Sequence, residues 1–200
     1  MPFTRRSLLA VVAAGSVLPR FAHAAEPASQ TERALGSANA KVTVLEFFSL
    51  TCTHCAHFAN TTFPKVKAEL IDTGKIRYVF RDFPLDQIAL AAAMVARSLP
   101  ADRYEPFISA LFANQDRWAF SRQANPIEEL WKTAALAGMS RASFDTAVAD
   151  TALKDWILAQ QGADQKKYGI NATPSFSING KTTSGAMAYE DFAKLVSEAA

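Results

Sequence analysis

The chain has 200 residues, half of them hydrophobic and a fifth charged, as expected for a globular protein of one domain or of one domain with an insertion. Its 21 basic and 19 acidic side chains give a formal net charge of +2. No apolar run reaches the roughly 18 residues that a membrane span needs. The sequence therefore predicts no membrane span in the mature chain, and it lacks the strong positive charge of a nucleic-acid binder.

The first 24 residues have the three-part layout of a cleavable signal peptide. Arg5 and Arg6 make the start positive, residues 7–18 are apolar, and Ala22-His23-Ala24 offers a cleavage site with small residues. The arginine pair resembles a twin-arginine export signal, with an ordinary export signal as the alternative. This leader holds three arginines and no acidic residue, so the mature chain would carry 18 basic and 19 acidic side chains. The small basic excess belongs to the leader, which argues against a nucleic-acid partner.

The first half of the mature chain alternates between strand and helix signals. Residues 25–40 are small and polar and predict a loose N-terminal arm, whereas residues 41–48 are β-branched and aromatic, as in a central strand. Apolar residues at near-helical spacing then predict a helix from Cys52 to about Asp72, kinked at Pro64. Residues 76–83 predict a second strand.

The second half begins with helices and ends with strands. Residues 85–168 repeat apolar side chains at helical spacing and predict five helices. Strand character returns at residues 174–178, Asn179-Gly180 is a strong hairpin turn, and residues 189–198 form an amphipathic helix. The predicted class is α/β, with a mixed central sheet flanked by helices. Residues 41–84 and 169–200 would build this domain, and residues 85–168 would be an inserted all-helical subdomain.

The two cysteines of the chain both lie in Cys52-Thr53-His54-Cys55. A structural disulfide here would close a very short loop and stabilise little. Attachment of c-type haem needs histidine directly after the second cysteine, but that residue is Ala56. A zinc site needs four ligands, usually from two separated pairs, and only two histidines lie nearby. Dithiol–disulfide exchange, without a metal or a separate cofactor, explains the motif best.

The place of the motif at a helix start assigns the two sulfurs different roles. Cys52 faces the free N–H groups and the positive end of the helix dipole, which favour the reactive thiolate. Cys55 lies three residues later on the same helical face and would resolve the mixed disulfide. His54 can place a donor or a positive charge near the Cys52 sulfur, or it can be an exposed residue without effect. We expect His57 to be an ordinary surface residue.

Glu46 is a carboxylate in an otherwise apolar predicted strand, six residues before Cys52. Burial of a charge is costly unless the group is paired or functional. One interpretation is that Glu46 handles a proton for the cysteine pair. The alternative is a structural ion pair with a nearby base such as Lys75 or Arg77.

Four stretches together resemble a known family. They are Leu45–Ser49 before the motif, Cys52–Cys55 itself, Arg81–Leu85, and Gly169–Phe176 followed by Asn179-Gly180. A strand that leads into Cys-x-x-Cys, with a late Thr-Pro before a hairpin, resembles the thioredoxin fold. The helical insertion narrows the resemblance to the DsbA-like thiol:disulfide oxidoreductases of the bacterial envelope, and it covers nearly all of residues 36–200.

The resemblance implies further site residues. Pro174 would follow a cis peptide bond and pack against the disulfide, with a simple proline at the start of a strand as the alternative. Thr173 would then offer its backbone to an extended substrate. Thr53 is a second expected substrate contact and stands where the family often has proline. An acidic residue at position 46 is thought to move the proton of the resolving thiol in this family.

Three functions remain open on the sequence. The first is a monomeric periplasmic oxidase that gives its Cys52–Cys55 disulfide to reduced exported proteins and is reoxidised by a quinone-linked membrane partner. The second is a reductase or isomerase kept reduced by a membrane carrier of thiol reducing equivalents. The threonine before the proline, Thr173, slightly favours this second function. Against an isomerase, residues 25–40 leave no room for the separate dimerisation domain that typical isomerases of this group carry. The third is a chaperone-like binding module that does not use its cysteines.

Overall fold

The computed structural model describes residues 27–200. The predicted signal peptide, residues 1–24, lies outside the described residues. Within residues 27–200, no helix combines the length and the apolar character needed to cross a membrane.

A five-stranded mixed sheet forms the centre of the molecule, in the order β1-β3-β2-β4-β5. Only the β2–β3 pair is parallel; the other pairs are antiparallel. The strands are β1 (Arg33–Leu35), β2 (Val42–Phe48), β3 (Ile76–Asp82), β4 (Ser175–Ile178) and β5 (Lys181–Ser184). This arrangement, with helices inserted between β3 and β4, confirms the predicted fold class.

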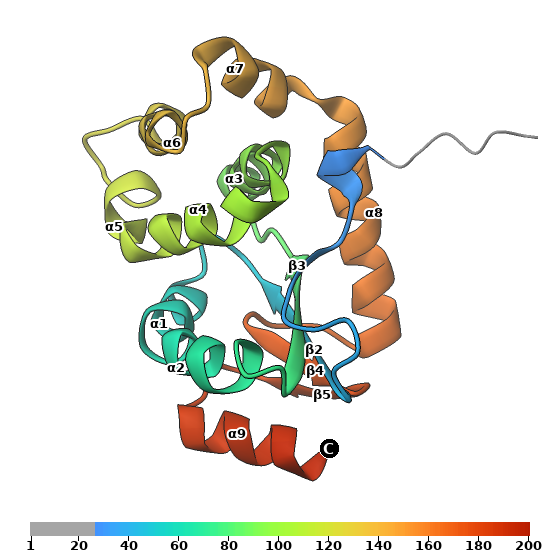
Figure 1. Cartoon of the computed structure of the whole chain (residues 1–200). Helices are drawn as coiled ribbons and strands as arrows, with labels where there is room; N and C mark the ends of the chain where they lie inside the picture. Colours follow the sequence, from blue (N-terminus) through green and yellow to red (C-terminus); the bar gives the residue numbers. More distant parts are fainter. Residues whose placement is uncertain (1–26) are drawn as a thin grey trace, which may run out of the picture.

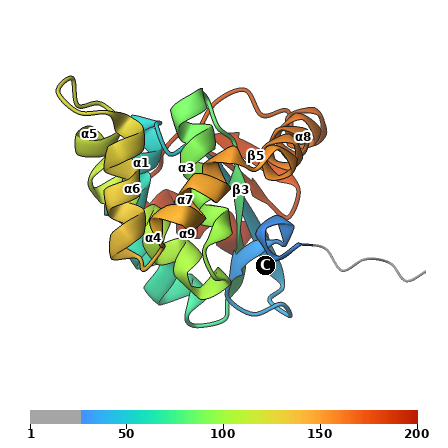
Figure 2. The ribbon, with the colours of Figure 1, turned by 90° about the horizontal axis from the view of Figure 1, so that it is seen from above.

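Helices cover both faces of the sheet and build the insertion (Figure 1). Near β2 and β3 lie α1 (Thr53–Thr61), α2 (Phe63–Val66), the π-helix η2 (Lys67–Ile71) and the final α9 (Tyr189–Glu198). The insertion contains α3 (Gln87–Ser98), α4 (Ala101–Ala113), α5 (Gln115–Trp118), α6 (Pro126–Leu136), α7 (Arg141–Ala149) and α8 (Thr151–Tyr168). Seen from above, α3, α4, α6 and α7 form one group, and α8 lies to one side of it, where it contacts both α3 and β3 (Figure 2). A short 3-10 helix, η1 (Ala28–Gln30), opens the described chain.

Capping residues set many of these boundaries. Asp86, Ser140 and Asp150 each accept a hydrogen bond from a backbone N–H in the first turn of the helix that follows. Gly169 ends α8 in the left-handed conformation, with φ of 67°. Asn179 has φ of 46° and the glycine after it 89°, as a tight hairpin turn requires.

The structure differs from the sequence prediction at two places before β3. The single helix predicted from Cys52 to Asp72 is divided at Thr62, two residues before Pro64, and ends as a π-helix. Proline has no N–H to continue the helical ladder, so the helix restarts there. The sequence also predicted no strand before residue 41, yet Arg33–Leu35 pairs with β3. Three residues are too few to show strand periodicity.

The core is continuous between the sheet and the insertion. One large cluster joins Val44 and Phe48 of β2 with Phe58 of α1, and it extends to Leu111 of α4 and Phe144 of α7. A smaller cluster, around Phe47, Phe83 and Ile170, lies on the opposite face of β2. Because side chains alternate along β2, Glu46 faces the large cluster, which also contains Cys55.

Candidate active site

Cys52 is the N-cap residue of α1, directly after the turn that follows β2. Its sulfur accepts a hydrogen bond from the backbone N–H of Cys55 at 3.4 Å, and its carbonyl accepts one from Ala56 at 3.1 Å. The sulfur therefore sits at the end of the helix where the N–H groups are unpaired and the dipole is positive. This is the position that the sequence predicted for the attacking sulfur.

A second segment, 121 residues further along the chain, meets Cys52. The Thr173–Pro174 peptide bond is cis, as the resemblance implied. When Cys52 is protonated, its thiol donates to the Thr173 carbonyl, with 3.2 Å between sulfur and oxygen. The Thr173 hydroxyl is buried and makes no hydrogen bond of standard geometry to another described residue. The structure thus brings Cys52, Thr173 and Pro174 together.

The two thiols differ strongly in acidity. The pKa of Cys52 is lowered from 9.0 to about 5, mainly by a hydrogen bond from the Cys55 side chain, with further help from the Thr173 side chain and from the backbone N–H groups of His54 and Cys55. The pKa of Cys55 is raised far above its ordinary value, first by burial and then by the neighbouring Cys52. Cys55 has no exposed surface, whereas Cys52 is partly exposed. At neutral pH Cys52 is the thiolate and Cys55 keeps its proton.

Glu46 has a different partner from the ones the sequence suggested. Neither Lys75 nor Arg77 reaches it; Arg77 pairs with Glu32 at the edge of the sheet. The Tyr78 hydroxyl instead donates to the Glu46 carboxylate at 2.8 Å. Burial raises the pKa of Glu46 from 4.5 to about 7, and the tyrosine hydrogen bond opposes part of this rise. Glu46 is 4% exposed, and its charge acts on Cys55, whose pKa it helps to raise.

The remaining predicted residues lie on the surface. The side chains of Thr53, His54 and His57 are exposed at the start of α1. The His54 side chain makes no hydrogen bond or ion pair with any residue from 27 to 200, and its contribution to the site is the backbone N–H near Cys52. Sequence reasoning treated His54 as a donor or charge near the sulfur, and that role stays a prediction.

Sequence reasoning missed a group of residues that hold the turn before Cys52. The Gln115 side chain, from the start of α5, donates to the carbonyls of Leu50 at 2.8 Å and Cys52 at 3.1 Å. The Thr51 hydroxyl donates to Asp86 at 2.6 Å. These contacts link the turn to the insertion. No local pattern could have revealed them, because Gln115 is 63 residues from Cys52.

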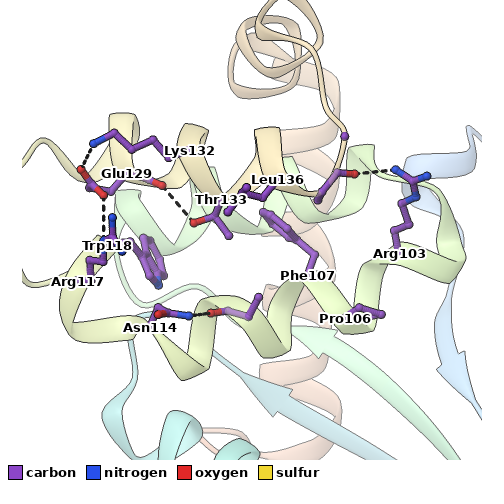
Figure 3. Close-up of a pocket in the computed structure, with 13 residues that line it drawn as sticks. Arg103, Pro106, Phe107, Asn114, Arg117, Trp118, Glu129, Lys132, Thr133 and Leu136 are labelled. Atoms are coloured by element: carbon purple, nitrogen blue, oxygen red, sulfur yellow. Dashed lines mark hydrogen bonds and ion pairs between the residues drawn. The ribbon is translucent and has the colours of Figure 1, made fainter.

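A separate groove of about 640 Å³ lies in the insertion, between α4, α5 and α6 (Figure 3). Phe107 and Trp118 line it, and Glu129 forms ion pairs with Lys132 and Arg117 at one end. None of the predicted site residues lines this groove. In the described part of the chain, no group of three or more His, Cys, Asp or Glu side chains is placed to hold a metal ion.

A Cys-x-x-Cys pair at a helix N-terminus, in contact with a cis-proline loop at one end of a mixed sheet, defines the class of thioredoxin-fold proteins. A model of the thioredoxin family matches residues 28–198. The crystal structure of Wolbachia pipientis alpha-DsbA1 superposes with a TM-score of 0.78 at 31% identity, over 84% of this chain and 90% of that one. The chain belongs to the DsbA-like family of thioredoxin-fold disulfide oxidoreductases, as the sequence predicted.

Two sequence relatives agree with this assignment. A "Putative protein-disulfide oxidoreductase" of Rickettsia bellii is 31% identical over 155 residues, which are 77% of this chain and 59% of that protein. The disulfide bond formation protein D of Bacillus subtilis is 26% identical over 184 residues, which are 86% of this chain and 78% of that protein. The chain thus spans less than two thirds of the Rickettsia relative.

Proposed function

We propose that this protein is a protein-disulfide oxidoreductase that forms disulfides in other exported proteins by giving up a Cys52–Cys55 disulfide. The observation that carries the proposal is the position of the Cys52 sulfur, which receives a hydrogen bond from the Cys55 backbone N–H at the start of α1, where its pKa is lowered. A thiolate stabilised in this way favours the reduced pair, and a pair that is stable when reduced is a strong oxidant. The names of the relatives, which describe disulfide oxidoreductases and disulfide bond formation, support the same reading.

The reaction takes two exchanges. In the first, a substrate thiolate attacks the Cys52 sulfur, the Cys52–Cys55 bond breaks, and a mixed disulfide joins substrate and Cys52. Cys55 leaves with the electron pair and takes up a proton. In the second, another substrate thiolate attacks the substrate sulfur of the mixed disulfide, and Cys52 leaves as its stable thiolate. The substrate has lost two electrons and gained a disulfide, and the enzyme pair is reduced.

Glu46 is the proposed source and acceptor of the Cys55 proton. Its carboxyl is buried on the same face of β2 as the core that contains Cys55, and its pKa of about 7 lets both forms exist at neutral pH. Protonated Glu46 would supply the proton when Cys55 leaves. Ionised Glu46 would remove it when Cys55 attacks a mixed disulfide during reoxidation.

The proposed function also implies a cellular location, substrates and a redox partner. The predicted signal peptide and the extracytoplasmic DsbA-like family favour the periplasm, with reduced exported proteins as substrates. Thr173 and Thr53 flank Cys52 and would contact an extended substrate, the first of them through its backbone. A quinone-linked membrane protein would reoxidise the pair.

The deciding measurement is the reduction potential of the Cys52–Cys55 pair, obtained by equilibration with glutathione buffers. We expect a value near the oxidising end of the thioredoxin-fold range, close to about −120 mV rather than about −270 mV. A value near −270 mV would make the protein a reductase kept reduced by a membrane carrier. Full activity in a refolding assay after Cys52→Ala and Cys55→Ala together would point to a binding module and end the oxidoreductase proposal.

A further inference from the structure

Tyr78 is a buried tyrosine whose hydroxyl the two exchange steps do not use. It lies on β3, is 0% exposed, and donates to Glu46 at 2.8 Å. Its ring packs against Phe63, Phe80 and Phe192, with centroid distances of 5.2, 5.3 and 6.5 Å. These contacts leave the ring little freedom, so the hydroxyl is fixed toward the carboxylate.

Among residues 27–200, Tyr78 is the one hydrogen-bond donor to the Glu46 carboxylate. The residues opposite Glu46 in the sheet are Phe80 on β3 and Phe176 on β4, both apolar. No lysine, arginine or histidine of the described chain pairs with the carboxylate. On α1, Cys55 interacts with both groups. The charge of Glu46 helps to raise the pKa of Cys55, and Cys55 helps to raise the pKa of Tyr78. The buried cluster therefore has three titratable members: Glu46, Tyr78 and Cys55.

We propose that Tyr78 is a positioning residue for thiol exchange, whose hydroxyl holds Glu46 in the ionised form and in the orientation that accepts the Cys55 proton. This inference rests on the proposed function and deepens it. A buried carboxylate without a cation would otherwise stay protonated at neutral pH, and a protonated carboxyl cannot act as a base. A neutral phenol stabilises the anion without adding a second buried charge.

The step that depends on this arrangement is the attack of Cys55 on a mixed disulfide. The Cys55 thiol loses its proton to the Glu46 carboxylate, and its sulfur forms a bond to the Cys52 sulfur. The bond between Cys52 and the bound thiol breaks, and that thiol leaves as a thiolate with the electron pair. Tyr78 keeps its own proton throughout and acts only through Glu46.

The test uses the reduced protein and the aromatic disulfide dithiobis-nitrobenzoate, which releases a coloured thiol at each exchange. The first release reports attack by Cys52, and the second reports resolution by Cys55. We expect Tyr78→Phe to move the pH midpoint of the second phase upward by about one unit, because a hydrogen bond to the anion is lost. The second phase would then be about fivefold slower at pH 7, with the midpoint of the first phase unchanged.

Tyr104→Phe is the matched control. Tyr104 is equally buried and also donates to a buried carboxylate, that of Asp82 at 3.0 Å, but it lies on α4 in the insertion. This variant should lose stability and leave both midpoints in place. In a Glu46→Gln background, Tyr78→Phe should produce no further shift. An equal shift in that background, or an unshifted second phase in Tyr78→Phe, would overturn the role of Tyr78.

Two further results keep the test decisive. If Tyr78→Phe does not fold, fluorination of the Tyr78 ring leaves the hydroxyl in place and makes it a stronger donor. The second midpoint should then move downward, and an unchanged or raised midpoint would overturn the inference. If the unmodified protein releases no second thiol at any pH, the proposed function fails instead, because the pair then cannot cycle.

Discussion

At the scale of single residues, the site depends on one short sequence with two unlike sulfurs. Hydrogen bonds stabilise the Cys52 thiolate, whereas burial, followed by the neighbouring Cys52, keeps Cys55 protonated. In the proposed reaction, this separation of the two pKa values assigns the attacking and leaving role to Cys52 and the resolving role to Cys55. The pair works as a unit because the Cys55 side chain is the largest single cause of the acidity of Cys52.

We therefore expect the acidity of Cys52 to depend on its partner. In the reduced protein, the thiolate absorbance in the ultraviolet should titrate with a midpoint of about 5. In Cys55→Ala the midpoint should rise by ~1–2 pH units, because a hydrogen bond to the anion is lost. Cys55→Ser keeps a donor at this position and should show a smaller rise. An identical midpoint in Cys55→Ala would show that the helix terminus alone controls the acidity.

At the scale of elements, the insertion and the thioredoxin-like domain meet at the turn that presents Cys52. Helix α5 has only four residues, yet its first residue, Gln115, donates to two carbonyls of that turn. On the other side of the turn, the N-cap residue of α3, Asp86, accepts from Thr51. The turn before Cys52 is thus held by two elements of the insertion as well as by β2 and α1.

We predict that Gln115→Leu loosens this turn. The Leu50 carbonyl would lose its buried partner, at a cost of about 1–3 kcal/mol in the free energy of unfolding. The midpoint of the Cys52 thiolate titration should also rise, because the sulfur is held less firmly against its donors. Gln161→Leu is the matched control, since Gln161 makes a similar contact from α8 to the Pro84 carbonyl at 3.1 Å. If both variants raise the midpoint equally, the effect is a general loosening and not a property of the Gln115 contact.

At the scale of the whole molecule, the acidity of Cys52 is coupled to folding. The folded pKa of Cys52, about 5, lies below its ordinary value of 9.0. Between these values the unfolded chain binds more protons, so this contribution to stability grows as pH rises and is lost as pH falls through 5. The contribution of Glu46 to stability depends on pH in the opposite direction. Its pKa is raised from 4.5 to about 7, so this contribution declines as pH rises across that window. Glu46 is present in both the oxidised and the reduced form, so a comparison of the two forms subtracts the part of its contribution that does not depend on the cysteines.

The difference in unfolding free energy between reduced and oxidised protein should therefore isolate Cys52. We expect this difference to shift in favour of the reduced form by about 2 kcal/mol between pH 5 and pH 8, after allowance for the partial exposure of Cys52. Urea unfolding of both forms across this range measures it, and Cys52→Ser supplies a reduced protein without the effect. A pH-independent difference would contradict the lowered pKa of Cys52.

Particular residues show how much of the fold and of the site the sequence determined. The spacing of Cys52 and Cys55, the apolar strand before them and the Asn179-Gly180 turn are local features, and local features follow from backbone preferences and burial periodicity. They were enough to predict the fold class, the helical insertion and the place of Cys52 at a helix start. Strand β1 and helix α5 were missed, because a three-residue strand and a four-residue helix are too short to show a period.

Only the tertiary structure decided which side chains form hydrogen bonds with Glu46 and with the turn before Cys52. Tyr78 reaches Glu46 through the register of β2 against β3, and Gln115 reaches the Cys52 turn through the docking of α5. As the alternative to proton handling, the sequence offered an ion pair of Glu46 with Lys75 or Arg77, and the structure gives Glu46 the Tyr78 hydroxyl instead. A hydrogen bond between buried groups depends on distances of about 3 Å between atoms that lie far apart in the chain, and only the packed fold sets such distances. The sequence therefore determined which sulfurs can react, and the fold decided which groups surround them.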